Sequence, residues 1–337
     1  MGLTSVLKSV CAAAGLNEWL VCRRRGDALV LNYHGVLNSR RADCASHVND
    51  EDAASFQAQL QWLNRHFIPV NLSDFGRFWS GEWRPAKPPV LVTFDDGYRN
   101  NLKVAAPILR QQGVPATFFL AAGYIGTDKT LWNDEVRARV QQWPDAKILS
   151  PLGDERLVPP DTAGRRDLAN SINRACKRLD AASLNSYLNW LREHTMQAQT
   201  MQDPEALAFM SWAEARELAA LGFDIGSHTV HHPILSRLHQ PAIAQELQES
   251  CATLQRELGR PCTAIAYPNG THEDVNATVL EEVRKAGYEW AFMTTPTWAK
   301  PACSRYEIPR IGSPGHTDLA TFKFYASGLH TRLKATA

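Results

Sequence analysis

The sequence has almost no excess of charge of either sign. Its 337 residues include 36 lysines and arginines and 35 aspartates and glutamates, so the formal net charge is +1. This balance gives no electrostatic reason to bind nucleic acid or another polyanion. We therefore expect no nucleic-acid partner, and a neutral or weakly charged substrate.

The cysteines lack any pattern of pairing. There are seven, which is an odd number, and they are scattered with no Cys-x-x-Cys pair. This usage argues against both a disulfide framework and a thiolate metal site. A reducing compartment fits it better, and we expect a cytoplasmic protein.

A long uninterrupted apolar run is also missing. The stretch Leu3 to Val21 contains Lys8 and Glu18, and its basic cluster Arg23 to Arg25 follows the apolar part. That order is wrong for a signal peptide, and the stretch is too interrupted for a membrane span. Apolar residues instead recur at helical spacing, namely Leu3, Val6, Leu7, Val10 and Ala14. Residues 1–27 are thus predicted to form an amphipathic helical segment, which either packs on the domain or rests on anionic lipid. Peripheral contact with the inner membrane stays open.

From residue 28 to about 330, short apolar runs alternate with helical patterns, which is typical of an α/β fold with a largely parallel sheet. The predicted strands are Ala28 to Tyr33, Val90 to Phe94, Ala116 to Leu120, Phe223 to Ile225, Ala264 to Tyr267 and Trp290 to Thr294. Helices are predicted over Phe56 to His66, over Asn101 to Gln112, from a capping box at Ser211 to Gly222, and from Thr271 with Asp274 to near Gly287.

Polar residues at the carboxyl ends of several strands, within one continuous β/α pattern, favour a single barrel-like domain. An open doubly wound sheet is the alternative, but no Gly-x-Gly-x-x-Gly follows the early strands. Residues 133–209 break the rhythm with a proline-rich stretch and charged, helix-favouring sequence. We expect this segment to be a largely helical insertion.

Two short stretches carry the chemistry. Asp95 and Asp96 end an apolar strand, where neighbouring side chains diverge, so that one carboxylate can bind a metal while the other faces a bound water. His228 and His232 are four residues apart, and on a helical turn they would share one face. One carboxylate and two imidazoles suit a divalent metal with an open position for water. Alone, Asp-Asp-Gly is equally an ordinary turn, and a pair that uses His231 stays open.

A third stretch, Tyr267-Pro268-Asn269-Gly270, again follows a strand. Proline and glycine around Asn269 can hold a backbone N–H toward a developing oxyanion, although a plain turn explains the stretch as well.

Together these stretches resemble the polysaccharide deacetylase family, the NodB homology domain of carbohydrate esterase family 4. The resemblance rests on Thr93-Phe94-Asp95-Asp96-Gly97, on His228-Thr229-x-x-His232-Pro233 and on Tyr267-Pro268-x-Gly270, and it runs from about Leu29 to Gly312. It implies a deformed (β/α) barrel that hydrolyses an N-acetyl group from an N-acetylated sugar.

The resemblance also implies roles for single residues. Asp96, His228 and His232 would hold a divalent metal, most simply zinc, and Asp95 would be the general base. Tyr267, Pro268 and Asn269 would contact the substrate near the oxyanion.

The chain departs from better known members at two positions. Ala266 stands where they carry an arginine that orients the base, and nothing after Gly270 matches their acidic histidine. Leu31 to Val36 resembles rearranged exopolysaccharide deacetylases that carry this histidine early, which makes His34 the expected general acid. Arg310 is a candidate to replace the missing arginine.

Residues Leu131 to Glu135 also resemble the rearranged members, so Trp132 is a candidate to stack on a sugar ring. With ten tryptophans in the chain, packing is the simpler role. The sequence thus predicts a metal-dependent sugar N-deacetylase of bacterial surface polysaccharide or glycolipid biosynthesis. A deformylase or other amidase, and a carbohydrate-binding protein without catalysis, remain alternatives.

Overall fold

The computed structural model of the chain describes residues 8, 11–12, 14–38, 50–195, 207–313, 315 and 318–330. The predicted apolar positions Leu3, Val6, Leu7 and Val10 lie outside these residues.

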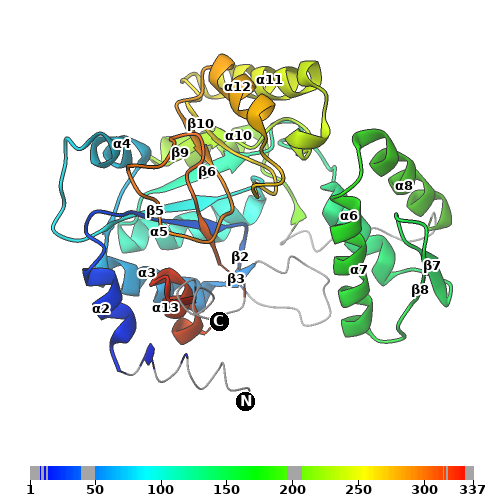
Figure 1. Cartoon of the computed structure of the whole chain (residues 1–337), viewed down its shortest axis with the longest axis horizontal. Coiled ribbons are helices and arrows are strands. Elements are labelled where there is room, and N and C mark those ends of the chain that lie inside the picture. Colours follow the sequence, from blue (N-terminus) through cyan, green and yellow to red (C-terminus); the bar gives the residue numbers. More distant parts are fainter. Residues whose placement is uncertain are drawn as a thin grey trace.

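A curled sheet of parallel strands forms the centre of the molecule (Figure 1). Its strand order is β11-β10-β9-β6-β5-β1-β12, with β4 beside β5, and every pairing is parallel. The bounds are β1 Leu29–Tyr33, β4 Ile68–Pro69, β5 Pro89–Phe94, β6 Ala116–Leu120, β9 Asp224–Ser227, β10 Ala264–Ala266, β11 Trp290–Phe292 and β12 Ile311–Gly312. The six predicted strands are present, and the deformed (β/α) barrel is confirmed as a curled half-barrel sheet surrounded by helices. A separate parallel pair joins β2 (Val36–Leu37) to β3 (Glu51–Asp52).

One short segment links the two edges of this sheet. Ile308 pairs with Phe292 of β11, and three residues later Ile311 pairs with Leu31 of β1. The segment therefore lies between the first and the last strand of the curl. Arg310 belongs to it, and its place in the molecule is set by this closure.

Alternate side chains along a strand face opposite sides of the sheet. Val30 and Leu91 belong to a cluster inside the curl, whereas Leu31 and Val92 belong to a larger cluster between the sheet and the outer helices. Asp95 follows Leu91 by four residues and so continues the inward series. The strand period brings functional side chains to the inner mouth of the half-barrel.

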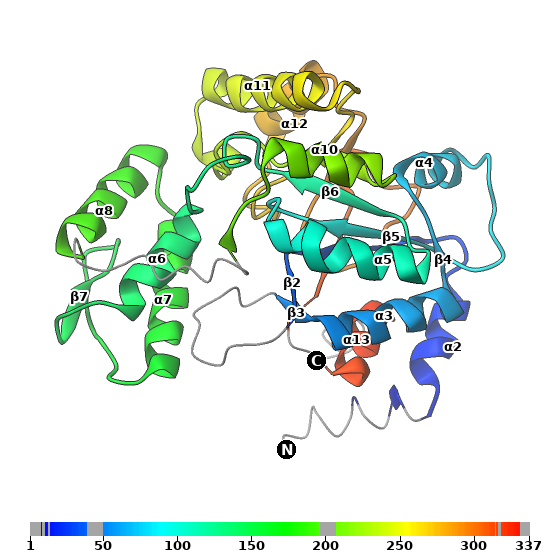
Figure 2. The ribbon, with the colours of Figure 1, turned by 180° about the vertical axis from the view of Figure 1, so that it is seen from behind.

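Helices cover the outside of the sheet (Figure 2). They are α3 Ala53–His66, α5 Ala106–Gln112 after a π-helical turn Asn101–Ala105, α10 Trp212–Ala220, α11 Gln240–Leu258 and α12 Ala277–Lys285. The capping box at Ser211 is present, with Glu214 bonded to the Ser211 backbone. The predicted helix start at Thr271 is wrong, because the Asp274 carboxylate accepts from the backbone and hydroxyl of Thr271 and so forms a turn. Helix α12 begins after Asn276, whose side chain caps it.

Residues 132–195 form a lobe beside the half-barrel (Figures 1 and 2). It contains α6 Trp132–Gln141, an antiparallel hairpin of β7 Lys147–Leu149 and β8 Glu155–Leu157, α7 Thr162–Cys176 and α8 Ala181–His194. A separate apolar cluster holds the lobe together, and Glu135 is paired with both Arg139 and Arg192. The hairpin was not predicted.

The described part of the N-terminal segment forms helix α2 (Leu16–Cys22). It packs on the domain, since Glu18 accepts from the Trp62 indole at 2.8 Å and pairs with Lys323 of α13 (Leu319–Ala326) at 2.9 Å. Among the residues that the structure describes, no helix combines the length and apolar character needed to span a bilayer. Membrane contact stays a prediction, which full recovery in the soluble fraction without lipid would exclude.

Helix α4 (Leu72–Ser80) packs at the amino ends of the strands, where the Asp224 carboxylate accepts from the Leu72 N–H at 2.8 Å. Burial raises the pKa of Asp224 above its ordinary 3.8. Below pH 3.8 this carboxyl is protonated in both the folded and the unfolded chain, so its burial carries no electrostatic penalty. As the pH rises through the folded pKa, the native state must bury a charged carboxylate, which lowers the free energy of unfolding. We expect Asp224→Asn, which keeps an acceptor for Leu72, to raise Tm at pH 7 and to raise it less at pH 4.

Thermal unfolding followed by circular dichroism measures this difference. Asp145→Asn, at an exposed position, is the control and should show no such pH-dependent gain. An Asp224→Asn variant that loses equal stability at both pH values would contradict the account.

Candidate active site and metal centre

The functional side chains meet at the carboxyl ends of the strands. Asp95 and Asp96 follow β5, His228 follows β9 and Asn269 lies three residues beyond β10. They line one cavity of about 650 Å³. This edge of the sheet is the place where an α/β barrel binds substrate, because the loops after the strands converge there.

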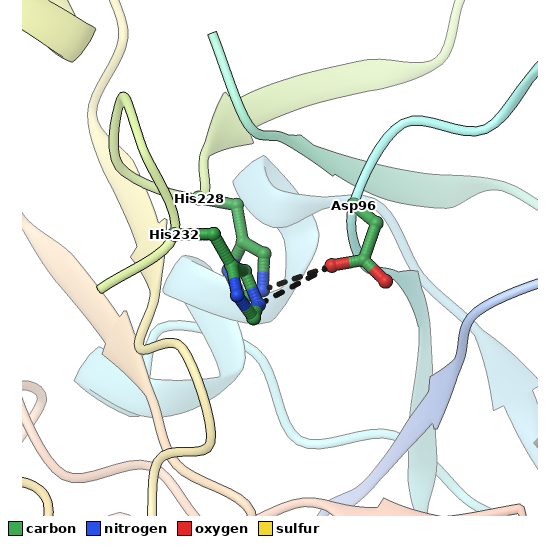
Figure 3. A group of neighbouring side chains, drawn as sticks. All are labelled: Asp96, His228 and His232. Carbon is green, nitrogen blue, oxygen red and sulfur yellow. Dashed lines mark ion pairs between the residues drawn. The ribbon is translucent and has the colours of Figure 1, made fainter. Parts of the chain in front are cut away.

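Asp96, His228 and His232 form a compact buried group (Figure 3). Asp96 Oδ1 lies 3.4 Å from His228 Nε2 and 3.5 Å from His232 Nε2. A tetrahedral zinc site with ligands at about 2.0–2.1 Å has edges of about 3.3–3.4 Å. The spacing therefore fits three corners of such a site.

The hydrogen bonding of these groups fits a cation as well. Asp96 Oδ1 is buried and accepts no hydrogen bond from any group in the described chain. His228 Nδ1 lies 2.8 Å from the Ala266 carbonyl, and donating to it leaves the Nε2 lone pair free to face Asp96. Burial lowers the pKa of His232 to about 4, so this imidazole is neutral near pH 7, as a ligand must be. Burial alone would raise the pKa of Asp96, but the two histidines outweigh it and hold the pKa far below its usual range.

The two histidines do not lie on a helical turn, as their spacing had indicated. Thr229 and His232 both have left-handed backbones, with φ of 65° and 55°, and the segment is a loop. Glu246 of α11 holds it by accepting from the Val230 N–H at 2.9 Å and the His231 N–H at 3.0 Å. The two rings are thus brought together by a loop that Glu246 holds in place, and not by the spacing of a helix.

His231 faces away from the metal group. Its ring lies 2.6 Å from Glu246 and its side chain is 63% exposed. The hydrogen bond to Glu246 raises the pKa of His231. The pair that could hold a metal is therefore His228 with His232.

Arg310 is fully buried and donates to Asp95 from its two terminal nitrogens, Nη1 and Nη2, at 2.7 and 2.8 Å. It also donates to the Thr93 hydroxyl and to the Met293 carbonyl, each at 3.0 Å. Burial by itself would raise the pKa of Asp95, but the Arg310 charge outweighs it and lowers the pKa of this carboxyl. Asp95 is thus ionised and fixed in orientation beside Asp96.

His34 follows β1 and lines the same cavity. Its carbonyl accepts from the Asn101 amide at 2.8 Å, which fixes the backbone at this point. Glycine at the next position leaves room for Asp50, since a Cβ on Gly35 would lie 2.3 Å from the Asp50 carboxylate. The early histidine thus reaches the centre that holds Asp95 and Asp96.

The stretch after β10 offers fewer amides than the sequence had indicated. The Tyr267 N–H donates to the Phe292 carbonyl at 3.0 Å, its hydroxyl donates to the Tyr306 carbonyl, and Pro268 has no N–H. Asn269 has a left-handed backbone with φ of 59°, lines the cavity and donates its N–H to no group in the described chain. In this turn Tyr267 and Pro268 thus offer no free N–H to an oxyanion, and Asn269 supplies the free amide; contact of Tyr267 and Pro268 with substrate stays a prediction.

Trp132 does not line the main cavity. It is 7% exposed, belongs to the apolar cluster of the lobe and borders two smaller cavities. Its burial favours packing over stacking on a sugar.

A set of basic residues at the cavity was not predicted from the sequence. Arg174, Lys177 and Arg178, at or just beyond the end of α7, line the main cavity together with Arg137 and Arg237. The first three are spaced i, i+3 and i+4, which places them on one side of a helix. That spacing was the signal available in the sequence.

Comparison with known proteins agrees with this site. The sequence profile of the family described as polysaccharide deacetylase matches residues 83–142 and 179–291. The chain is 21% identical over 303 residues to YxkH of Bacillus subtilis (strain 168), provisionally named a polysaccharide deacetylase, with 89% of this chain and 76% of YxkH covered. It is 28% identical over 116 residues to the poly-beta-1,6-N-acetyl-D-glucosamine N-deacetylase of Staphylococcus epidermidis, but covers only 39% of that enzyme and 31% of itself.

Solved structures share the fold. IcaB from Ammonifex degensii superposes with a TM-score of 0.58 at 19% identity, covering 90% of this chain and 97% of IcaB. The Streptococcus pyogenes deacetylase PplD, solved in complex with acetate, gives a TM-score of 0.56 at 19% identity, covering 86% and 95%. At these identities the likeness establishes the architecture.

The family match spans just over half of the sequence, including Asp95, Asp96, His228, His232 and Asn269, while His34 and Arg310 lie outside it. The resemblance seen in the motifs is confirmed, and the chain belongs to the polysaccharide deacetylase family.

Proposed function

We propose that the protein is a metal-dependent hydrolase that removes the acetyl group from an N-acetylated sugar of a bacterial surface polysaccharide or glycolipid. One observation carries the proposal: a buried Asp-His-His group of zinc-like spacing stands beside a second aspartate that Arg310 keeps ionised. A binding protein has no use for a base at this position. The name of the Staphylococcus epidermidis relative supports an N-acetylated sugar as the class of substrate.

Asp96, His228 and His232 are the residues that would hold the cation. Such a cation supplies Lewis-acid polarisation of the amide carbonyl and activation of a water molecule. Two imidazoles and one carboxylate suit zinc and leave a position open for substrate.

Asp95 is the general base. An amide is a poor electrophile, so attack by water requires removal of its proton as the new bond forms. The carboxylate is ionised, and both of its oxygens are held by Arg310, so it cannot rotate away. Arg310 acts on the reaction by positioning Asp95.

The Asn269 N–H is the donor for the oxyanion that develops on the amide oxygen. Thr294 donates its hydroxyl to the Asn269 carbonyl and so fixes this turn beforehand. His34, which lines the same cavity, protonates the sugar amine as it leaves.

We expect Asp95→Asn to lower acetate release from N-acetylglucosamine oligomers by about 100-fold or more, because general-base catalysis contributes about 10²–10⁴. Zinc content, measured by mass spectrometry, should stay at the wild-type level, and EDTA should abolish the wild-type activity until zinc is restored. Asp145→Asn is the control. Undiminished acetate release from Asp95→Asn would sink the mechanism.

The same assay separates the alternatives. If the zinc-loaded wild-type protein released no acetate from several glycans, the result would favour a carbohydrate-binding protein without catalysis. Faster release of formate from N-formyl substrates would favour a deformylase.

A second prediction concerns His34. His34→Gln should slow hydrolysis of the N-acetyl sugar by about 100-fold, because an amine must be protonated to leave. Hydrolysis of 4-nitrophenyl acetate should slow far less, because its leaving group departs as the anion. Equal losses on both substrates would show that His34 does not act as the acid.

A third prediction concerns Arg310. Arg310→Lys keeps a positive charge but loses the two-pronged contact, so the pKa of Asp95 should rise. Because the base works only when ionised, the acidic limb of the kcat/KM profile should move to higher pH, with zinc retained. An unchanged profile would discard this role. Arg310→Ala would leave Asp95 buried and unpaired, at a cost of about 3–5 kcal/mol in unfolding free energy, so Tm is measured for both variants.

A further inference from the structure

Five basic side chains are among the residues that line the 650 Å³ cavity. Arg137 comes from α6, Arg174 from α7, Lys177 and Arg178 from the residues directly after α7, and Arg237 from the 3₁₀ turn Leu235–Arg237 that follows the histidine loop. We call these five residues the basic wall. It stands in a chain whose net charge is only +1.

Most of the basic wall has no counter-ion. In the part of the chain that the structure describes, Arg174, Lys177, Arg178 and Arg237 make no ion pair, whereas Arg137 binds Asp134 at 2.7 Å. The Nε atom of Arg237 is buried and lacks a hydrogen-bond partner among those residues.

The acidic residues of the cavity do not balance this charge. Asp95 is paired with Arg310, and Asp96 belongs to the metal group. Outside that centre the lining contains Glu273 and Asp274, and the Asp274 carboxylate accepts from Thr271. With Arg137 paired to Asp134, the other four cations of the wall share the cavity with these two carboxylates.

The cations are close enough to repel one another. Burial lowers the pKa of Lys177, and the charges of Arg137 and Arg174 lower it further, against the opposing effect of Asp274. Holding like charges together at a partly buried site is unfavourable unless an anion binds between them.

The basic wall borders the reacting centre. A second cavity, of about 300 Å³, is lined by His232 and Asn269 as well as by Arg137, Arg174 and Lys177. An anionic group in this cavity would thus sit next to a sugar whose amide lies at His232 and Asn269. Guanidinium groups suit this task, because they bind phosphate and carboxylate oxygens in pairs.

Three of the five residues of the basic wall lie outside the family match. The family match omits residues 143–178, and Arg174, Lys177 and Arg178 lie within the omitted stretch. The lobe therefore adds charge from outside the matched residues to a site whose Asp95, Asp96, His228, His232 and Asn269 lie within them.

We propose that the basic wall binds an anionic group of the substrate, so that the sugar to be deacetylated carries a phosphate ester or a neighbouring carboxylate. This inference rests on the proposed function and adds the substrate class. The surplus of cations favours a doubly charged phosphate over a single carboxylate. In this proposal residues of the lobe select a charged substrate, whereas residues of the half-barrel carry out the hydrolysis.

The test compares three substrates that share one amide. These are N-acetylglucosamine 1-phosphate, a disaccharide of glucuronate and N-acetylglucosamine, and the neutral methyl glycoside of N-acetylglucosamine. For the zinc-loaded full chain we expect kcat/KM to be at least about tenfold higher for an anionic substrate than for the neutral one, since one charge-assisted hydrogen bond is worth about that much. The preference should shrink when sodium chloride rises from about 0.05 to about 0.5 M. The better anionic substrate identifies the group as phosphate or carboxylate.

Variants locate the effect. Arg174→Ala and Lys177→Ala should each reduce the anionic-to-neutral ratio of kcat/KM by about tenfold. Arg166→Ala, which removes an exposed charge of α7 that does not line the cavity, should leave the ratio unchanged. Ratios that stay near one in wild type, or that neither variant changes, overturn the proposal.

A binding measurement separates this inference from the proposed function. Calorimetry with metal-free protein should show that N-acetylglucosamine 1-phosphate binds, and that Lys177→Ala weakens the binding about tenfold. If that result held while no substrate lost acetate, the basic wall would stand and the deacetylase assignment would fall. If the neutral glycoside were hydrolysed while metal-free protein bound no phosphate, the assignment would stand and the basic wall would fall.

Discussion

The ion pair between Arg310 and Asp95 is the interaction on which the site depends. Charges buried this completely are costly unless every polar atom is satisfied, and Arg310 meets that condition with two bonds to Asp95, one to Thr93 and one to Met293. These partners join β5, the end of β11 and the closing segment. The arginine that bridges the ends of β5 and β11 thus also keeps the base ionised.

The metal group follows the opposite logic. Asp96 Oδ1 is buried and has no hydrogen-bond partner among the described residues, and His228 and His232 point their Nε2 atoms toward it (Figure 3). Asp95 and Asp96 are neighbours in sequence, yet one is saturated by a guanidinium and the other is left to the two imidazoles. The left-handed backbone of Asp96, with φ of 74°, turns the two carboxylates apart. This backbone conformation therefore helps to separate the base, Asp95, from the candidate metal ligand, Asp96.

Net charge proved a poor guide to the local field. The chain is nearly neutral as a whole, and this led us to expect a neutral or weakly charged substrate. The lobe nevertheless brings cations to the cavity that make no ion pair with any described residue, because Arg174 near the end of α7 and Lys177 and Arg178 just after it line the same cavity as the metal group. A bound group feels mainly the charges that lie within about one Debye length of it, and the composition of the whole chain does not show where those charges are.

The sequence by itself determined the strands, the α/β class and the family, because short apolar runs and the motifs at their carboxyl ends are local signals. It also placed Asp95, Asp96, His228 and His232 at one edge of a parallel sheet. Only the tertiary structure decided that Arg310 reaches Asp95, which is 215 residues away, that the histidines converge through a loop, and that Tyr267 has no free amide. Those outcomes depend on chain closure and on competition for hydrogen bonds, which join residues with no fixed spacing along the chain.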